Sequence, residues 1–158
     1  WVDIGGSYLM SEIQAACLYA QLEESNVIKM NRIESWKYYH TKLKKLFDLN
    51  FLELPVIPKE CEHNGHMFFI KVSFKEDRDK LIKCLAAKNI SALFHFIPLH
   101  SSPAGELMSN FHGEDNFTTD DSNRLIRLPL WFGMDRTDLD KVIDAIFSFF
   151  DCDSKFID

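Results

Sequence analysis

The sequence predicts an α+β domain of two layers, in which a sheet of three or four strands carries helices on one face. Three features lead to this expectation. Residues 68–74 alternate between two faces, one of them wholly apolar, as in a half-buried strand. Residues 77–88 carry an apolar stripe at helical spacing. Residues 11–47 are mostly helix formers, which predicts a long N-terminal helical arm at 1–49 and a small domain at 50–158.

The bulk composition fits one folded domain. The 158 residues are 46% apolar and 27% charged, the balance of a globular protein. The net charge of −6, without a long Lys/Arg block, argues against a nucleic-acid partner. No apolar run reaches the roughly 18 residues that a membrane span needs, and no signal peptide is visible. Four cysteines lie far apart without a CxxC pair, which favours reduced thiols and a cytoplasmic protein.

The arm is expected to form two helices. Ser11 suits the N-cap of the first, and the residues from there to Leu22 carry almost no charge. A helix with so little polar surface should be buried on most sides, by a missing domain or by a second subunit. The second helix runs to about Phe47 with apolar residues three or four apart. Because the chain begins at Trp1 rather than Met, we expect a piece of a longer polypeptide.

In the small domain, strands and helices are expected to alternate. Asn89 suits the left-handed position that ends a helix, and Pro98 has no N–H with which to continue a strand. A strand, a helix and a second strand in this order are compatible with a right-handed crossover between parallel or non-adjacent strands. The expected elements are an edge strand or linker at 52–57, a strand at 66–74, a helix at 77–88, a strand buried on both faces at 90–97, a short helix at 105–111, a helix at 118–126, an edge strand at 127–132, and a last helix capped by Asp135.

Two histidines mark a candidate site. His95 lies late in the expected buried strand and His100 follows just beyond its end, where a titratable group leaves the core. The simpler alternative is a core histidine that hydrogen-bonds a backbone carbonyl. The spacing of Cys61 with the nearby histidines matches no closed zinc module, so we expect no metal site. A Gly-Gly-Ser turn at 5–7, just before a helix start, is a weak signal for anion binding.

Several sequence blocks together resemble one enzyme family. The blocks are residues 3–23, 66–68, 94–100, 112–115 and 127–130. In this order along the chain they are similar to the C-terminal part of the DegT/DnrJ/EryC1/StrS sugar-nucleotide aminotransferases. That resemblance implies a small domain of a fold-type I pyridoxal-phosphate (PLP) transaminase that works as a homodimer. It implies amino transfer from glutamate to a nucleotide-linked 4-keto-6-deoxy sugar for surface polysaccharide synthesis.

The resemblance also assigns residues. It implies that His95 and His100 bind substrate, and that Ser7 and Tyr8 lie near the cofactor phosphate of the neighbouring subunit. Many family members have Asn and Arg where this chain has Ser7 and Leu9, so the Arg contribution is missing. The family's Schiff-base lysine lies upstream of this region. We therefore expect no catalytic residue in the chain, no PLP bound to it alone, and no activity without the upstream domain.

Two alternatives remain at this point. One is a non-catalytic α+β module that binds a small molecule or a partner helix. The other is a degenerate family member that is kept for assembly only. The sequence upstream distinguishes them, because an active enzyme needs a lysine there and an acid that pairs with the pyridine nitrogen.

Overall fold

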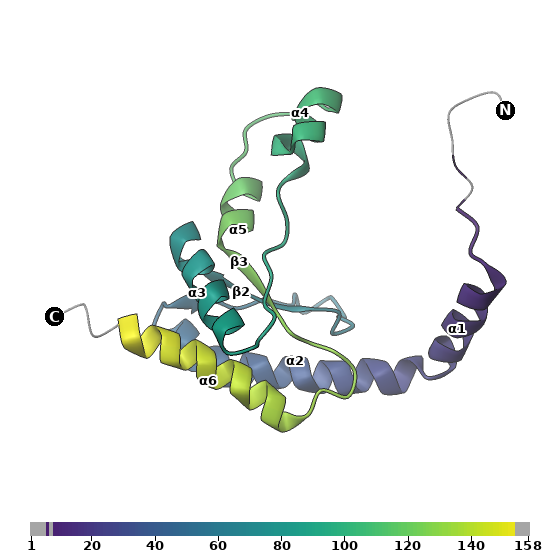
Figure 1. Ribbon diagram of the computed structural model, residues 1–158, viewed down its shortest axis with the longest axis horizontal. Coiled ribbons are helices and arrows are strands. Elements are labelled where there is room, and N and C mark those ends of the chain that lie inside the picture. Colours follow the sequence, from purple (N-terminus) through teal and green to yellow (C-terminus); the bar gives the residue numbers. More distant parts are fainter. Residues whose placement is uncertain (1–5, 7, 154–158) are drawn as a thin grey trace.

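The computed structural model describes residue 6 and residues 8–153, with side chains to residue 151 (Figure 1). Its elements follow the alternation of helices and strands that the sequence predicts, and the α+β class is confirmed. In chain order they are α1 (Glu12–Glu23), α2 (Ser25–Asp48), β1 (Leu52–Glu53), β2 (Phe68–Val72), α3 (Lys75–Ala87), the 3-10 helix η1 (Leu99–Ser101), α4 (Pro103–Met108), α5 (Thr118–Arg124), β3 (Leu125–Leu128) and α6 (Arg136–Asp153).

The sheet is antiparallel throughout the part of the chain that the structure describes. Its order is β1-β2-β3, with Leu52 opposite Val72 at one edge of β2 and Phe69 opposite Arg127 at the other. The expected crossover from β2 through α3 does lead to a non-adjacent position, because β3 lies between β2 and the segment that follows α3. After α3 the chain reaches the outer edge of β3, where only Leu93 forms a bridge to Arg127. The two residues exchange both backbone hydrogen bonds, at 2.7 and 3.1 Å.

The prediction of a strand buried on both faces at 90–97 is wrong. Apart from the Leu93 bridge, the segment is irregular, and its apolar side chains face outward from the described chain. Leu93 is 57% exposed and Phe96 is 68% exposed, whereas Ala92 is buried. The β-forming composition of this segment correctly indicated pairing at a sheet edge, although only one bridge forms. It wrongly indicated that the side chains are buried.

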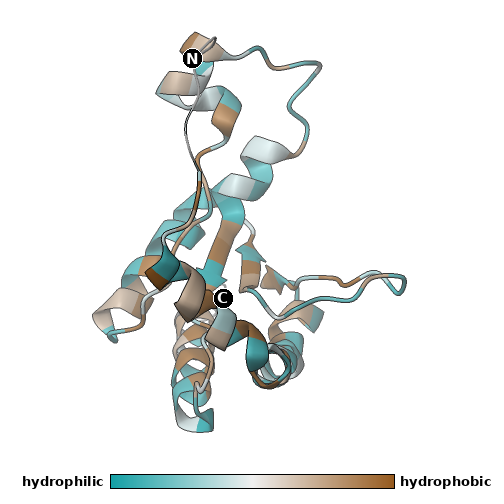
Figure 2. Ribbon diagram, turned by 90° about the vertical axis from the view of Figure 1, so that its right-hand side faces the viewer, coloured by the Kyte–Doolittle hydropathy of each residue, from teal (hydrophilic) through white to brown (hydrophobic). Residues whose placement is uncertain are grey.

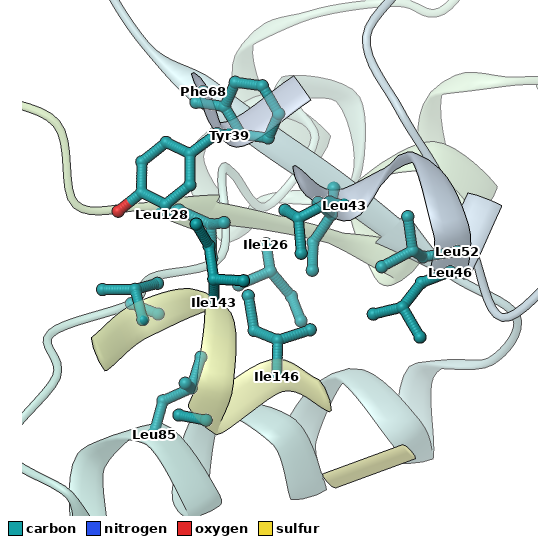
Figure 3. Packing of buried hydrophobic residues seen from close by; sticks show 14 of the residues in the cluster. Tyr39, Leu43, Leu46, Leu52, Phe68, Leu85, Ile126, Leu128, Ile143 and Ile146 are labelled. Atoms are coloured by element: carbon teal, nitrogen blue, oxygen red, sulfur yellow. The ribbon is translucent and has the colours of Figure 1, made fainter. Parts of the chain in front are cut away.

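The core lies between one face of the sheet and three helices (Figure 3). Alternate residues of β2 are buried, as the sequence alternation predicts. Each large aliphatic or aromatic side chain removed from water contributes about 1.5–3 kcal/mol, so this cluster is the main stabilising feature of the domain. Its fully buried members include Tyr39 and Leu43 from α2, Phe68 and Ile70 from β2, Leu81 and Leu85 from α3, Ile126 and Leu128 from β3, and Ile146 from α6.

Local capping explains where several helices begin. Ser11 forms a capping box with Gln14 at the start of α1, as expected for an N-cap. The Asp135 carboxylate accepts the Asp138 backbone N–H at 2.9 Å, which confirms the expected cap of α6. Asn89 has φ of 60°, the left-handed conformation that ends α3.

Helix α1 projects from the end of α2, away from the sheet (Figure 1), and it therefore points toward the viewer in Figure 2. None of its residues is buried within the described chain, although it is almost uncharged. The burial of α1 expected from the sequence is therefore not provided by the described residues. No described helix is long and apolar enough to cross a membrane. Cys17, Cys61 and Cys84 are free thiols.

Candidate functional site

The irregular segment between α3 and η1 carries His95, and two neighbouring helices hold it in place. Arg78 of α3 is 7% exposed, its guanidinium lies 5.2 Å from the ring centroid of Phe94, and its Nη1 donates to the Ser122 carbonyl at 3.0 Å. The Ser122 hydroxyl of α5 donates in turn to the carbonyl of Phe96. His95 therefore lies between two anchored residues, and the peptide bond that joins it to Phe96 is cis.

His95 contacts a strand arginine. Its ring stacks on Phe96 with centroids 3.8 Å apart, and its Nε2 lies 3.4 Å from Nη1 of Arg127 in β3. A guanidinium can only donate, so Nε2 accepts and the ring proton of a neutral His95 is on Nδ1. Partial burial lowers the pKa of His95, and the positive charges of Arg127 and His66 lower it further.

Arg32 completes a cationic cluster around Arg127. We use this name for Arg32, His66, His95 and Arg127, which come from α2, the loop before β2, the segment before η1, and β3. Arg32 Nε donates to the Gly65 carbonyl at 3.0 Å, and its Nη2 donates to the His66 carbonyl. Burial lowers the pKa of Arg32, and Arg127 lowers it further by charge repulsion. Arg32 thus lies near Arg127, which in turn contacts the neutral ring of His95.

His100 occupies a different setting. It lies in η1, its Nε2 is 3.0 Å from Oδ2 of Asp115, and its ring packs on Phe111 with centroids 4.3 Å apart. Asp115 also accepts from the N–H and the hydroxyl of Thr119. The Thr119 hydroxyl chiefly lowers the pKa of Asp115, and His100 adds to the effect. The structure therefore gives His95 and His100 separate partners and does not bring them into one cluster.

The residues expected near a cofactor phosphate are only partly described. Ser7 lies outside the described residues, and Tyr8 is 95% exposed. At the start of α1 the backbone N–H groups of Ser11 and Gln14 already donate to the two side chains of the capping box. These two N–H groups therefore already have acceptors within the described chain.

A metal site has no support in the described part of the chain, where no three His, Cys, Asp or Glu side chains are arranged to hold an ion. His63 instead packs on Trp36, with ring centroids 4.5 Å apart.

The sequence interpretation found His95 but missed the arginines. Arg127 lies between Ile126 and Leu128, both buried, so strand alternation turns it to the opposite face of the sheet. A charged residue inside a short apolar strand was the available signal. No comparable signal identified Arg32, because its partners are backbone carbonyls 33 and 34 positions away.

Comparison with family models matches residues 1–147 to the DegT/DnrJ/EryC1/StrS aminotransferase family. Among curated proteins, MJ1066 of Methanocaldococcus jannaschii is 29% identical over 150 residues, which cover 92% of this chain and 38% of MJ1066.

Solved structures show the same fold. The aminotransferase TlmJ of Streptoalloteichus hindustanus superposes with a TM-score of 0.81 at 17% identity, over 96% of this chain and 39% of TlmJ. DesV of S. venezuelae, solved with a ketimine intermediate, gives 0.77 at 27% identity over 87% of this chain and 36% of DesV. The PLP form of the sugar aminotransferase Spr1654 of Streptococcus pneumoniae gives 0.72 at 19% identity, over 89% and 36%. The chain spans less than two fifths of the length of each relative named here.

Proposed function

The chain belongs to the DegT/DnrJ/EryC1/StrS aminotransferase family, and from this premise we propose that it is the C-terminal small domain of a PLP-dependent sugar aminotransferase. The family match over residues 1–147 is the observation that carries the proposal. The 27% identity to DesV adds support beyond a shared fold, because it extends over 87% of the chain.

The proposed reaction moves an amino group from glutamate to a nucleotide-linked 4-keto-6-deoxy sugar. The sequence blocks resemble those of TDP-4-keto-6-deoxy-D-glucose aminotransferase of enterobacterial common antigen and lipopolysaccharide biosynthesis, and this resemblance is the reason for the choice of sugar. The enzyme would act in the cytoplasm as a homodimer, within the synthesis of a surface polysaccharide.

Within that enzyme, residues 1–49 would form an interdomain arm and residues 50–158 the small domain. PLP supplies an electron sink for amino transfer when it is bound, and its lysine would come from the upstream domain. This chain would provide His95 and His100 toward the substrate. Ser7 and Tyr8 would approach the cofactor phosphate of the neighbouring subunit.

The exposed apolar surface of the arm supports the assembly proposed here. Ile13 is 79% exposed, and Tyr19 and Leu22 are more than half exposed on the same helix. Side chains of this kind gathered on an almost uncharged helix are typical of a surface that another domain or subunit covers. The proposed upstream domain and a second subunit are both candidates for the covering surface.

The test is amino transfer by the complete protein. With PLP, glutamate and TDP-4-keto-6-deoxy-D-glucose, it should release 2-oxoglutarate and the 4-amino sugar in equal amounts. The 158-residue chain alone is the control. It should take up PLP only as weak, scattered labelling of surface lysines after borohydride, without a stoichiometric, pH-dependent visible band. Amino transfer by this chain alone would overturn the assignment of the chemistry to an upstream domain.

A second outcome separates the competing class. If the complete protein bound the nucleotide sugar but released no 2-oxoglutarate with any keto sugar offered, a non-catalytic binding module would be the better description. A complete protein that lacked the upstream lysine would point the same way.

A further inference from the structure

The arginines of this chain divide into two groups by their partners. Three of the five lie beside carboxylates: Arg78 with Asp79 at 2.8 Å, Arg124 with Glu53 at 2.7 Å, and Arg136 with Glu34 at 3.3 Å. Arg32 and Arg127 have no acidic partner among the described residues. These two are also the arginines of the cationic cluster, where two histidines surround them.

Backbone carbonyls fix the guanidinium of Arg32, and strand pairing fixes the backbone position of Arg127. Two consecutive carbonyls, of Gly65 and His66, accept from one edge of Arg32 and leave its Nη1 without a partner in the described chain. Arg127 is held in β3 by Phe69 on one side and Leu93 on the other. Because β2 begins just after His66 and pairs with β3, the two arginines converge on the same end of the sheet.

Such an arrangement is unfavourable without a counter-charge. Two partly buried cations near each other repel, and repulsion is stronger at a partly desolvated site than in water. Other arginines of the chain offset their charge by pairing with carboxylates, as Arg124 does with Glu53 and Asp120. Guanidinium groups hold carboxylate and phosphate oxygens through two parallel hydrogen bonds, so an oxyanion is the ligand that this cluster suits.

We propose that Arg32 and Arg127, flanked by His95 and His66, form an oxyanion-binding site of this chain. The inference that the oxyanion belongs to a substrate rests on the proposed function, because both substrates of that reaction carry one. Glutamate and 2-oxoglutarate carry carboxylates, and the nucleotide sugar carries a diphosphate. The shared chemistry is a small group with two or more anionic oxygens.

His95 makes this site responsive to its ligand. In the described structure its neutral ring accepts a hydrogen bond from Arg127. An anion between the arginines would compete for that donor and would neutralise the positive field of Arg127 and His66. Both changes favour the protonated ring, so His95 should gain a proton when the oxyanion binds.

The test uses the 158-residue chain, which contains the whole cluster. Its backbone and histidine ring signals are followed by NMR during titration with 2-oxoglutarate, with TDP and with inorganic phosphate in separate arms. We expect saturable shifts at His95, at Leu93 and at the loop around Gly65. Arg127→Gln and Arg32→Gln should each weaken binding about tenfold or more, the scale of a charge-assisted hydrogen bond. Arg127→Lys should recover part of the loss.

Arg136→Gln is the matched control, because Arg136 is an exposed arginine that already has a carboxylate partner. It should bind like the unaltered chain. Since Arg32 also holds the loop before β2, the core methyl signals of each variant show whether it has kept its fold. Arg127→Gln carries the test if Arg32→Gln does not fold.

The three titrations show which kind of oxyanion the site binds. Binding of 2-oxoglutarate alone assigns the site to the amino donor, and binding of TDP with phosphate assigns it to the nucleotide sugar. Absence of saturable shifts in all three arms, or equal loss of binding in Arg136→Gln, overturns the site. That failure would leave the proposed aminotransferase activity untouched, because the activity is measured separately on the complete protein.

Discussion

The Nε of Arg32 donates a hydrogen bond of 3.0 Å to the carbonyl oxygen of Gly65, which fastens the loop before β2 to helix α2. The contact depends on a close approach of two backbones. A Cβ at Gly65 would lie 3.0 Å from the carbonyl carbon of Arg32 and from the backbone nitrogen of Ile33. Gly65 is buried and has φ of 63°, a conformation that residues with a Cβ adopt at a cost.

Gly65→Ala should therefore destabilise the domain by about 2–3 kcal/mol, since backbone strain and a backbone contact add together. The measurement is the free energy of unfolding in urea. Gly133→Ala is the control, because Gly133 has φ of 80° but no heavy atom within 4 Å of its Cβ position. It should cost only the conformational part, about 1 kcal/mol. Equal losses in the two variants would mean that the close approach to α2 has no energetic consequence.

A second glycine, Gly105, allows η1 and α4 to pack closely together. A Cβ at Gly105 would lie 1.6 Å from the carbonyl oxygen of Leu99, so any larger residue must separate the two turns. Because most of this segment is exposed, Gly105→Ala should change global stability by less than about 1 kcal/mol. It should instead speed proteolytic cleavage between residues 99 and 117. Gly113→Ala, where the Cβ position has no neighbour within 4 Å and only φ of 83° opposes the change, should speed cleavage less than Gly105→Ala. Unchanged cleavage in Gly105→Ala would contradict the packing of α4 on η1.

The fold could be predicted from the sequence mainly where one pattern of residues indicates both a helix or strand and the face of it that is buried. The alternation in 68–74 predicted β2 and its buried face, and the caps of α1 and α6 were read from Ser11 and Asp135. The stripe along α2 was only partly correct. Trp36 and Leu43 are buried as expected, whereas Val27 and Met30 are exposed because the first turns of α2 extend beyond the sheet.

The site was harder to predict because it depends on pairing between distant segments. The residues around His95 form an apolar run, and composition alone does not say which surface covers it. The helix 118–126 and strand 127–132 expected from the sequence are α5 at 118–124 and β3 at 125–128, since pairing with β2 begins at Leu125. Only this register shows that Arg127 lies opposite Phe69 and beside His95.

The pKa of His95 provides a direct check of the cationic cluster. Partial burial, Arg127 and His66 hold it below its ordinary value of 6.5. Arg127→Gln should raise this pKa, because it removes one of the two nearby positive charges. Two-dimensional NMR of the histidine rings between pH 4 and 8 measures the change. Arg124→Gln removes an arginine that is paired with Glu53 and should leave the pKa of His95 in place.

The same shift has a consequence for stability. The unfolded chain takes up a proton at His95 as the pH falls through 6.5, whereas the folded chain takes it up only at lower pH. The unfolded state therefore binds more protons in this window, and the contribution of His95 to stability is present above 6.5 and is lost as the pH falls. Urea unfolding should show a shallower loss between pH 6.5 and 5 in Arg127→Gln than in the unaltered chain. An identical pH profile would contradict the coupling between Arg127 and His95.

Substitution of His95 in the complete protein distinguishes a role in substrate binding from a role in supporting the fold. His95→Ala should lower turnover or raise the KM for a substrate, while the melting temperature changes little, because the ring is half-buried at a sheet edge and is not part of the core. His112→Ala, at an exposed loop position, is the matched control and should leave both quantities unchanged. His100→Ala should act differently, since its contact with Asp115 supports the loop after η1; we expect faster proteolysis of that loop and a smaller kinetic effect. A sharp drop in melting temperature for His95→Ala, with unaltered turnover and KM, would mean that His95 supports the fold and does not meet the substrate.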